Sequence, residues 1–332
     1  MNSIHKQKRR SVLAGCALTA IVLGATLPTT VLAQAWPSKP VKVIVNFPPG
    51  GAADQIARAI TVPLADALGQ PVVVENRGGA GGNIGGDAVA KSPADGYTLL
   101  MSSGGMVSIN PAIYSKMSFD PAKDLTAVAA AARVLVFLEV KPTLPVNDAK
   151  EFIAYLKANP GKLSYATPGN GSSPHLAGEM FKDMAKVFAV HVPYRGAAPA
   201  MQDLLAGQVD YMFDPGIGLQ HVRAGKLKLL AVGSPKRSSA FPNVPTLDEM
   251  GLKGFDADTV FGFYAPTGTP APVVTRLNSE INKILGSQPF KDRMLAMGAE
   301  PSPMTPAAFH DKAMEDAARF GKLIRDRNIR AD

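Results

Sequence analysis

Short apolar runs alternate with amphipathic stretches along most of the chain. Runs rich in β-branched residues predict strands, and apolar positions at helical spacing predict helices. The predicted strands cover 41–47, 71–75, 97–102, 133–140, 163–166, 189–193, 209–213, 227–232 and 259–264. The predicted helices cover 52–68, 83–91, 147–158, 174–186, 197–206, 216–224, 272–285, 289–297 and 305–326. This alternation is typical of an α/β fold with mostly parallel sheets.

Two long apolar runs divide this pattern. One covers Val134–Val140 and the other Asp258–Ala265, and a complete strand-and-helix series lies between them. We therefore expect one lobe made of 36–139 and 257–332, and a second lobe, 140–256, inserted into it. Two extended crossings would connect the lobes as a hinge, and ligands usually bind in the cleft of such proteins.

Residues 1–35 have the pattern of a cleaved export signal. A basic start precedes the apolar core Val12–Leu27, and Ala33-Gln34-Ala35 supplies an A-x-A cleavage site. The core is too short for a spanning helix. We therefore expect cleavage near Ala35 and a periplasmic location. Arg9-Arg10 leaves the twin-arginine route open beside ordinary secretion. Cys16, the single cysteine, lies within the signal core.

The signal also accounts for much of the positive charge. The chain has 35 basic and 27 acidic residues, a formal charge of +8, and residues 1–35 hold four of the basic ones. The remainder carries only +4, so nucleic-acid binding loses its main support. Its length is enough for a core without disulfides. The histidines after the signal have no metal-ligand spacing. We expect no nucleic-acid partner, no metal and no cofactor.

The most informative motif is Pro-Pro-Gly-Gly-Ala-Ala-Asp at 48–54, between a predicted strand and a predicted helix. Two prolines and two glycines leave a corner of bare backbone. The first N–H groups of the helix have no internal partners and lie at the positive end of its dipole. Small anions, carboxylates included, bind at such positions. The motif therefore predicts a protein that holds a carboxylate.

Three further strand-to-helix corners cover Ser102–Gly105, Thr167–His175 and Tyr194–Ala198. Ligands of open α/β sheets bind beyond the carboxyl ends of strands, where such corners lie. Gly and Pro also mark ordinary turns, so one corner alone indicates little. Four corners, two in each predicted lobe, favour a binding site.

Several side chains near these corners have two interpretations each. Asp54 satisfies the helix dipole, or it fixes the Gly-Gly corner or binds an amino group of a ligand. Arg195 pairs with a carboxylate or is simply solvated. Asp214 ends a predicted strand and is a candidate acceptor for a ligand or for the other lobe. Phe47 and Tyr194 flank a ligand or fill the core at strand ends.

Catalytic motifs are weak. Gly79–Gly85 reads G-x-G-x-x-x-G, with Ile84 where a dinucleotide loop has its third glycine. No G-x-S-x-G elbow occurs. Ser172 and His175 share one helix start and have no evident orienting acid. An exported hydrolase that uses Ser172 and Ser173 is therefore a minor alternative, and we expect the protein not to be an enzyme.

Ordered motifs along the chain resemble a known family. They are Trp36–Pro40, Phe47–Gly51, Gln70–Arg77, Gly79–Gly85, Asp95–Leu100, Asn110-Pro111, Pro193–Gly196, Gly207–Asp210 and Phe241–Thr246. Together they resemble the Bug (Bordetella uptake gene) family of periplasmic solute-binding proteins of tripartite tricarboxylate transporters. The resemblance covers essentially the whole chain after residue 35. It implies a two-lobe type II periplasmic-binding-protein fold, the Venus-flytrap fold, which closes on a small carboxylated ligand.

The resemblance also implies roles for individual residues. Main-chain groups and waters at the first corner would hold the carboxylate, at Phe47, Pro49, Gly50, Gly51 and Asp54. Other loops would close over it, through Ser103, Ser172, Ser173, Gly196, Ala197 and Asp214. Gly104–Val107 departs from the polar loop expected there, which favours a more apolar or bulkier ligand.

The expected partners are a small carboxylate, aliphatic or aromatic, with one or two acid groups, and the integral-membrane permease subunits of the transporter. The protein itself is expected to be a monomer. A ligand-sensing subunit for a membrane receptor stays an alternative to the transport role.

Overall fold

A computed structural model describes residues 36–326 and 329–330. The signal predictions, including Cys16 and the cleavage site near Ala35, lie outside the described residues. The chain divides into the units Met1–Ser38 and Lys39–Asp332, and the elements below all belong to the second. No helix in 36–326 or 329–330 combines the length and the apolar character needed to cross a membrane.

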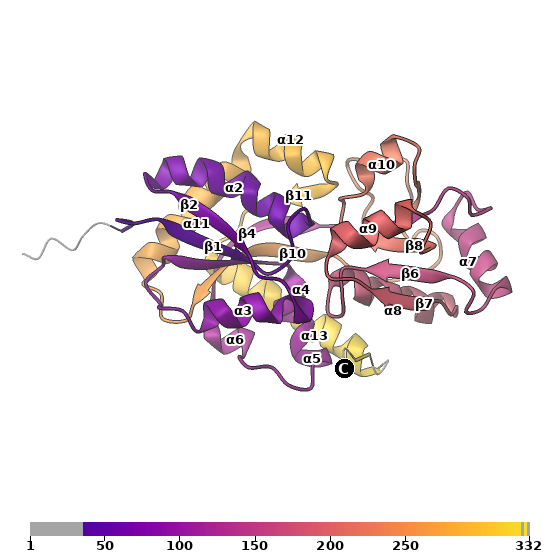
Figure 1. Ribbon diagram of the computed structural model, residues 1–332, viewed down its shortest axis with the longest axis horizontal. Helices are drawn as coiled ribbons and strands as arrows, with labels where there is room; N and C mark the ends of the chain where they lie inside the picture. The colour runs from indigo at the N-terminus through magenta and orange to yellow at the C-terminus, as the bar shows by residue number, and fades with distance from the viewer. Residues whose placement is uncertain (1–35, 327–328, 331–332) are drawn as a thin grey trace, which may run out of the picture. The chain divides into compact units, whose positions relative to one another are not determined.

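A six-stranded sheet has the order β11-β4-β10-β3-β1-β2. Its strands are β1 (Val41–Val45), β2 (Val72–Asn76), β3 (Thr98–Ser102), β4 (Leu125–Val134), β10 (Thr259–Pro266) and β11 (Ala299–Pro301). Figure 1 shows α2 (Ala52–Leu68), α11 (Ala271–Gly286) and α12 (Gln288–Ala296) on one face of the sheet. The other face carries α3 (Asn83–Ala90) and α13 (Pro306–Asp326), which enclose a core around Ile44, Leu100 and Phe309.

The second sheet has five strands in the order β7-β6-β8-β5-β9. They are β5 (Phe137–Val140), β6 (Ser164–Thr167), β7 (Val190–Pro193), β8 (Tyr211–Asp214) and β9 (Lys228–Val232). The helices α7 (Ala149–Ala158) and α8 (Ser173–Ala185) share an aromatic core with Tyr165 and Tyr211, whose rings stack 5.4 Å apart. A separate cluster packs α9 (Ala197–Leu205) against Ala166 and Met212.

The described residues also form five short helical elements. They are η1 (Ala80–Gly82), α4 (Gly104–Ser108), α5 (Asn110–Ile113), α6 (Pro121–Asp124) and α10 (Leu219–Arg223). Of these, only the α10 region was predicted as a helix, over 216–224. The observed helix is shorter because a loop after Asp214 takes up the first residues of that range.

The prediction of one strand over 133–140 is wrong. This region contains the end of β4 and the whole of β5, which lie in different sheets on either side of Leu135 and Val136. Gly233 N–H, on the segment that follows β9, donates to Val136 O (2.8 Å), so the two crossing segments contact each other. The lobe boundaries at 139/140 and 256/257 stay a proposal, and the change of sheet places the first crossing slightly earlier.

The expectation of mostly parallel sheets is also wrong. β1 pairs in parallel with β2 and β3, and β6 with β7 and β8. However, β5 and β10 are antiparallel to both of their neighbours. These are the strands next to the crossings. Each enters its sheet from the other lobe, and therefore runs against the strands of the local β-α units.

Helix α13 connects the two cores. Phe309, near its start, is buried with Tyr264 in the core of the six-stranded sheet. Phe320 and Ile324, near its end, are buried with Phe152 in the core of the five-stranded sheet. The lobes are therefore linked by packing along one helix as well as by two crossing segments.

We expect Gly262→Ala to destabilise the protein by about 2 kcal/mol, because β10 has no room for a side chain there. A Cβ at Gly262 would lie 2.4 Å from Phe309 Cζ and 2.6 Å from Ala129 O. Urea denaturation measures the loss. Gly286→Ala is the matched control, since a Cβ at the end of α11 meets nothing within 4 Å. Equal stability of the two variants would contradict the expectation.

Candidate functional site

The corner between β1 and α2 presents unpaired backbone N–H groups. Gly51 is the N-cap residue of α2, and no side chain caps this helix. Within the described part of the chain, the N–H groups of Ala52 and Ala53 donate to no protein acceptor. They lie at the positive end of a helix of 17 residues. The corner therefore offers amide donors to an anion.

Asp54 fixes this corner. Its buried carboxylate accepts hydrogen bonds from Gly50 N–H (3.0 Å) and from Arg58 Nε (3.0 Å). Asn76 Nδ2 donates both to Asp54 Oδ1 (2.9 Å) and to Phe47 O (2.9 Å). Burial acts to raise the pKa of Asp54, but the hydrogen bonds from Arg58, Gly50 and Asn76 outweigh it and hold the pKa below its usual value. Of its candidate roles, the geometry supports the fixing of the Gly-Gly corner.

The corner before α9 meets the first corner from the other sheet. Gly196, the N-cap residue, has φ of +128° and provides no side-chain cap. Among the described residues, the N–H groups of Ala197 and Ala198 find no acceptor. A Cβ at Gly50 would lie 3.8 Å from Ala198 Cβ, and one at Gly196 would lie 3.0 Å from Pro48 Cγ. The starts of α2 and α9 therefore approach each other closely, and a larger residue at Gly196 would separate them.

Three serines add hydroxyl groups to this region. Ser172 caps α8, because its Oγ accepts a hydrogen bond from the N–H of His175 in the first turn of the helix (3.3 Å). The same Oγ donates a hydrogen bond to Gly169 O (2.7 Å). Ser173 Oγ accepts a long hydrogen bond from Thr259 Oγ1 (3.4 Å). Ser103 is only 4% exposed, and its Oγ has no partner among the described residues. Ser103 is therefore the hydroxyl most available to a ligand.

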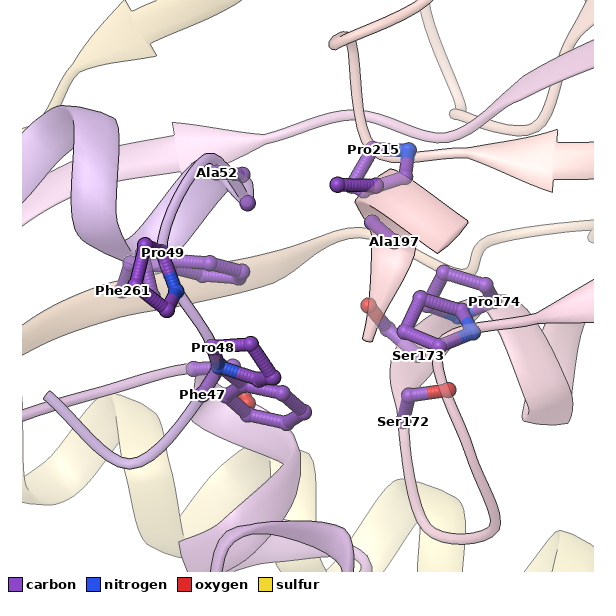
Figure 2. A pocket seen from close by; sticks show the side chains of 15 residues that line it. Phe47, Pro48, Pro49, Ala52, Ser172, Ser173, Pro174, Ala197, Pro215 and Phe261 are labelled. Carbon is purple, nitrogen blue, oxygen red and sulfur yellow. The ribbon is translucent and has the colours of Figure 1, made fainter. Parts of the chain in front are cut away.

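These elements line a cavity that is partly open to solvent. Residues from both lobes line it: Phe47, Pro48, Pro49, Gly51, Ala52, Ala53, Ser103, Pro168, Ser172, Ser173, Pro174, Ala197, Ala198, Pro215 and Phe261. Figure 2 shows Phe47, Pro48, Pro49, Ala52 and Phe261 on one side of the cavity. Ser172, Ser173, Pro174, Ala197 and Pro215 lie on the other. The four corners predicted from the sequence thus meet at one cavity between the lobes.

The thirteen candidate residues divide into two groups. The cavity is lined by Phe47, Pro49, Gly51, Ser103, Ser172, Ser173 and Ala197. The others lie around it: Gly50, Asp54, Tyr194, Arg195, Gly196 and Asp214. Gly50 and Gly196 form the contact between the two corners. Tyr194 and Arg195 line an outer, more open cavity, which shares Phe47, Pro48, Pro49 and Pro168 with the inner one.

Asp214 lies in a fully buried pair of carboxyl groups with Glu139. Phe137 is registered with Asp214 across β5 and β8, which makes Glu139 a diagonal neighbour on the same face. Asp214 Oδ2 accepts from the N–H groups of Gly216 and Gly218, both at 2.8 Å. In the described chain, its Oδ1 and both Glu139 oxygens have no donor. Burial raises the pKa of Asp214 to about 7, and burial together with the charge of Asp214 raises the pKa of Glu139.

Sequence reasoning missed some of the cavity wall. Pro48, Pro168, Pro174 and Ala198 lie within the four predicted corners, where their position was a usable signal. Phe261 on β10 lies outside these corners, and nothing in the sequence around it marks it as a residue of the cavity wall. It reaches the cavity because β10 lies beside a crossing segment and its side chain faces the opposite lobe's loops.

The Ser172–His175 pair lacks the geometry of an activated nucleophile. The Nδ1 atom of His175 accepts a hydrogen bond from Gly171 N–H (3.4 Å), and its ring stacks on His191 at 4.6 Å. Burial lowers the pKa of His175 to about 4. The described residues contain no group of three His, Cys, Asp or Glu side chains that could hold a metal ion.

Two sheets joined by crossing segments, with a cavity between them that helix starts enclose, define a two-lobe type II periplasmic-binding-protein fold. The chain belongs to the TctC family, the tripartite tricarboxylate transporter family receptor, whose model matches residues 56–329. The Bug-type resemblance of the sequence is thereby confirmed, and the members of this family to which the chain is similar are binding proteins.

Relatives agree with this assignment. The chain is similar to protein BugT of Bordetella pertussis, with 38% identity over 91% of this chain and 93% of BugT. It is similar in structure to the periplasmic binding protein BugD, with a TM-score of 0.85, 36% identity, and coverage of 89% of this chain and 99% of BugD. It is also similar to Rpa4515 of R. palustris, solved with adipate, with a TM-score of 0.86, 36% identity and coverage of 89% and 99%.

Proposed function

We propose that this protein is a periplasmic receptor that captures a small carboxylate between its lobes and presents it to the permease subunits of a tripartite tricarboxylate-type transporter. One observation carries the proposal. Two helix starts without caps, one from each lobe, approach each other at a single cavity. The adipate bound to Rpa4515, a relative of the same fold, supports a carboxylate as ligand.

The carboxylate would bind to backbone amides rather than to a cation. The donors are the free N–H groups of Ala52 and Ala53 on one lobe and of Ala197 and Ala198 on the other, directly or through water. Ser103 Oγ adds a buried hydroxyl. Of the remaining candidates, Asp54 and Gly50 hold the first corner in shape, and Gly196 allows the second corner to approach it.

This arrangement would couple binding to closure. A ligand shifts a conformational equilibrium only by its differential affinity for the two states. Here half of the donors belong to each lobe, so the full set is available only when the lobes are together. The closed, loaded protein is then the form that a permease can distinguish from the empty one.

The proposal is tested by calorimetry and thermal unfolding with a panel of aliphatic and aromatic carboxylates. At least one acid should raise the unfolding temperature, as mass action requires of a ligand that binds only the folded state. The corresponding primary amides are the control, since they keep the shape of the acids and lose the charge. Failure of every carboxylate in the panel, or equal binding of acid and amide, would contradict the proposal.

Arg195→Ala is expected to slow ligand association by a few-fold and to leave dissociation nearly unchanged. Arg195 is exposed and lines the outer cavity, where its charge would attract an anion without contacting it in the closed site. Stopped-flow measurements at low and high salt separate the two rates, and the difference should shrink as salt rises. Arg195→Lys should restore the rate. A large change in dissociation instead would place Arg195 in direct contact with the ligand.

A further inference from the structure

The wall of the inner cavity has no charged side chains. All fifteen described residues that line it are apolar residues, glycine or serine. Phe47, Pro174, Pro215 and Phe261 give it broad apolar surfaces on both lobes. Removing a charge from water is costly unless the protein pairs it, so this wall disfavours any ionised group beyond those that the helix starts can pair.

The positive charge available in the cavity matches one carboxylate. A helix start without a cap carries roughly half an elementary charge. The α2 and α9 starts are both without caps, and they approach so closely that a Cβ at Gly50 would lie 3.8 Å from Ala198 Cβ. Together they supply about one positive charge at one place. The start of α8 adds less, because Ser172 already caps it.

The hydroxyl groups add little for a second acid group. Ser172 Oγ both donates and accepts hydrogen bonds within its own loop. Ser103 Oγ is buried and has no partner among the described residues, and Ser173 Oγ accepts from Thr259 Oγ1, so of the three serines these two can donate to a ligand. A second carboxylate would therefore have no cation in the cavity wall and at most one neutral hydroxyl donor.

We propose that the ligand is an aromatic or alicyclic monocarboxylate: one acid group held by the two helix starts and Ser103, on a compact apolar ring in contact with Phe47 and Phe261. This proposal rests on the proposed function and narrows its substrate class. Flat proline and phenylalanine surfaces fit a ring better than a flexible chain, because a ring loses less conformational freedom on binding. Phe261 is then a specificity-determining residue.

The test compares 4-methylbenzoate with terephthalate by isothermal titration calorimetry at neutral pH. The two acids have similar size and differ in whether the para group is a methyl or a second carboxylate. We expect 4-methylbenzoate to bind at least tenfold more tightly. Equal or tighter binding of terephthalate or adipate would overturn this inference and leave the proposed function standing. Binding of no acid at all would overturn both.

A variant series tests the contact with the ring. Phe261→Leu keeps an apolar side chain at a buried position, and should weaken 4-methylbenzoate binding by about tenfold through the loss of an aromatic contact. Phe241→Leu is the control, because Phe241 packs against Phe137 and Arg223 away from the cavity. Unchanged affinity in Phe261→Leu, or an equal loss in the control, would refute the role of Phe261.

Discussion

Gly51→Asp is expected to abolish carboxylate binding while leaving the fold as stable as before, or slightly more stable. Gly51 is the N-cap of α2 with φ of −75° and ψ of 169°, a backbone geometry that aspartate adopts without strain. An aspartate there would accept hydrogen bonds from the first-turn amides, and its charge would repel the ligand. The loss of charge-assisted hydrogen bonds should cost about 100-fold or more in affinity. Calorimetry measures the affinity and urea denaturation the stability.

Two variants at the same position separate charge from size. Gly51→Ala adds a Cβ that would lie 3.7 Å from Pro48 O, an ordinary contact, and should keep most of the affinity. Gly51→Asn caps the helix without a charge and should fall between alanine and aspartate. If Gly51→Asp binds as well as the unchanged protein, the amides of α2 are not the anchor. Gly50→Val is the less clear experiment, because φ of +82° at Gly50 would strain a valine whether or not a ligand is present.

The second large effect concerns the buried carboxyl pair. Glu139→Gln is expected to stabilise the protein more at pH 7.5 than at pH 5. Its gain in the free energy of unfolding should be about 2 kcal/mol larger at the higher pH. Burial raises the pKa of Asp214 to about 7, and the pKa of Glu139 is raised as well. The two carboxyl groups have ordinary pKa values in the unfolded state and raised pKa values in the folded state. At a pH between these values, the folded state therefore binds more protons than the unfolded state. Stability from this pair is present below about pH 4 and is lost as the pH rises through about 7.

Glutamine at position 139 removes the cost of ionising two neighbouring buried carboxyl groups, because its amide does not titrate and can donate a hydrogen bond to Asp214. The measurement is urea denaturation of both proteins from pH 5 to 7.5. His175 and His191 have lowered pKa values, to about 4 and about 3, and contribute with the opposite sign in part of this range. The comparison is therefore between variants at each pH. Glu315→Gln, at an exposed position of α13, is the control. A difference that does not depend on pH would contradict the coupling.

The sequence was sufficient for features that depend on local chemistry. The Pro-Pro-Gly-Gly corner, the α2 helix and the start of α9 follow from which residues fit a tight turn and a helix start, and no distant contact is needed to recognise them. The helix start marked by Pro174 is also local, but the sequence favours Ser173 as its cap with Ser172 free, whereas in the structure Ser172 is the N-cap of α8 and Ser173 is the first helical residue. Thus the four corners could be named before their meeting point was known.

Features that depend on tertiary context were not accessible in this way. The strand β4 is largely alanine, a residue depleted in strands, and it forms because β10 and β11 pair with it on either side. Glu139 and Asp214 become neighbours only through the register of β5 on β8. Phe261 reaches the cavity through the placement of one lobe against the other. Each of these requires knowledge of which strands pair.

The helix α13 has a consequence for how the protein is made. Phe320 and Ile324 complete the core of the five-stranded sheet, although they follow that sheet by many residues in the chain. The five-stranded sheet therefore cannot bury its full apolar surface until residues 306–326 have been synthesised. Until then its core stays partly exposed, and in that state the nascent chain is accessible to chaperones.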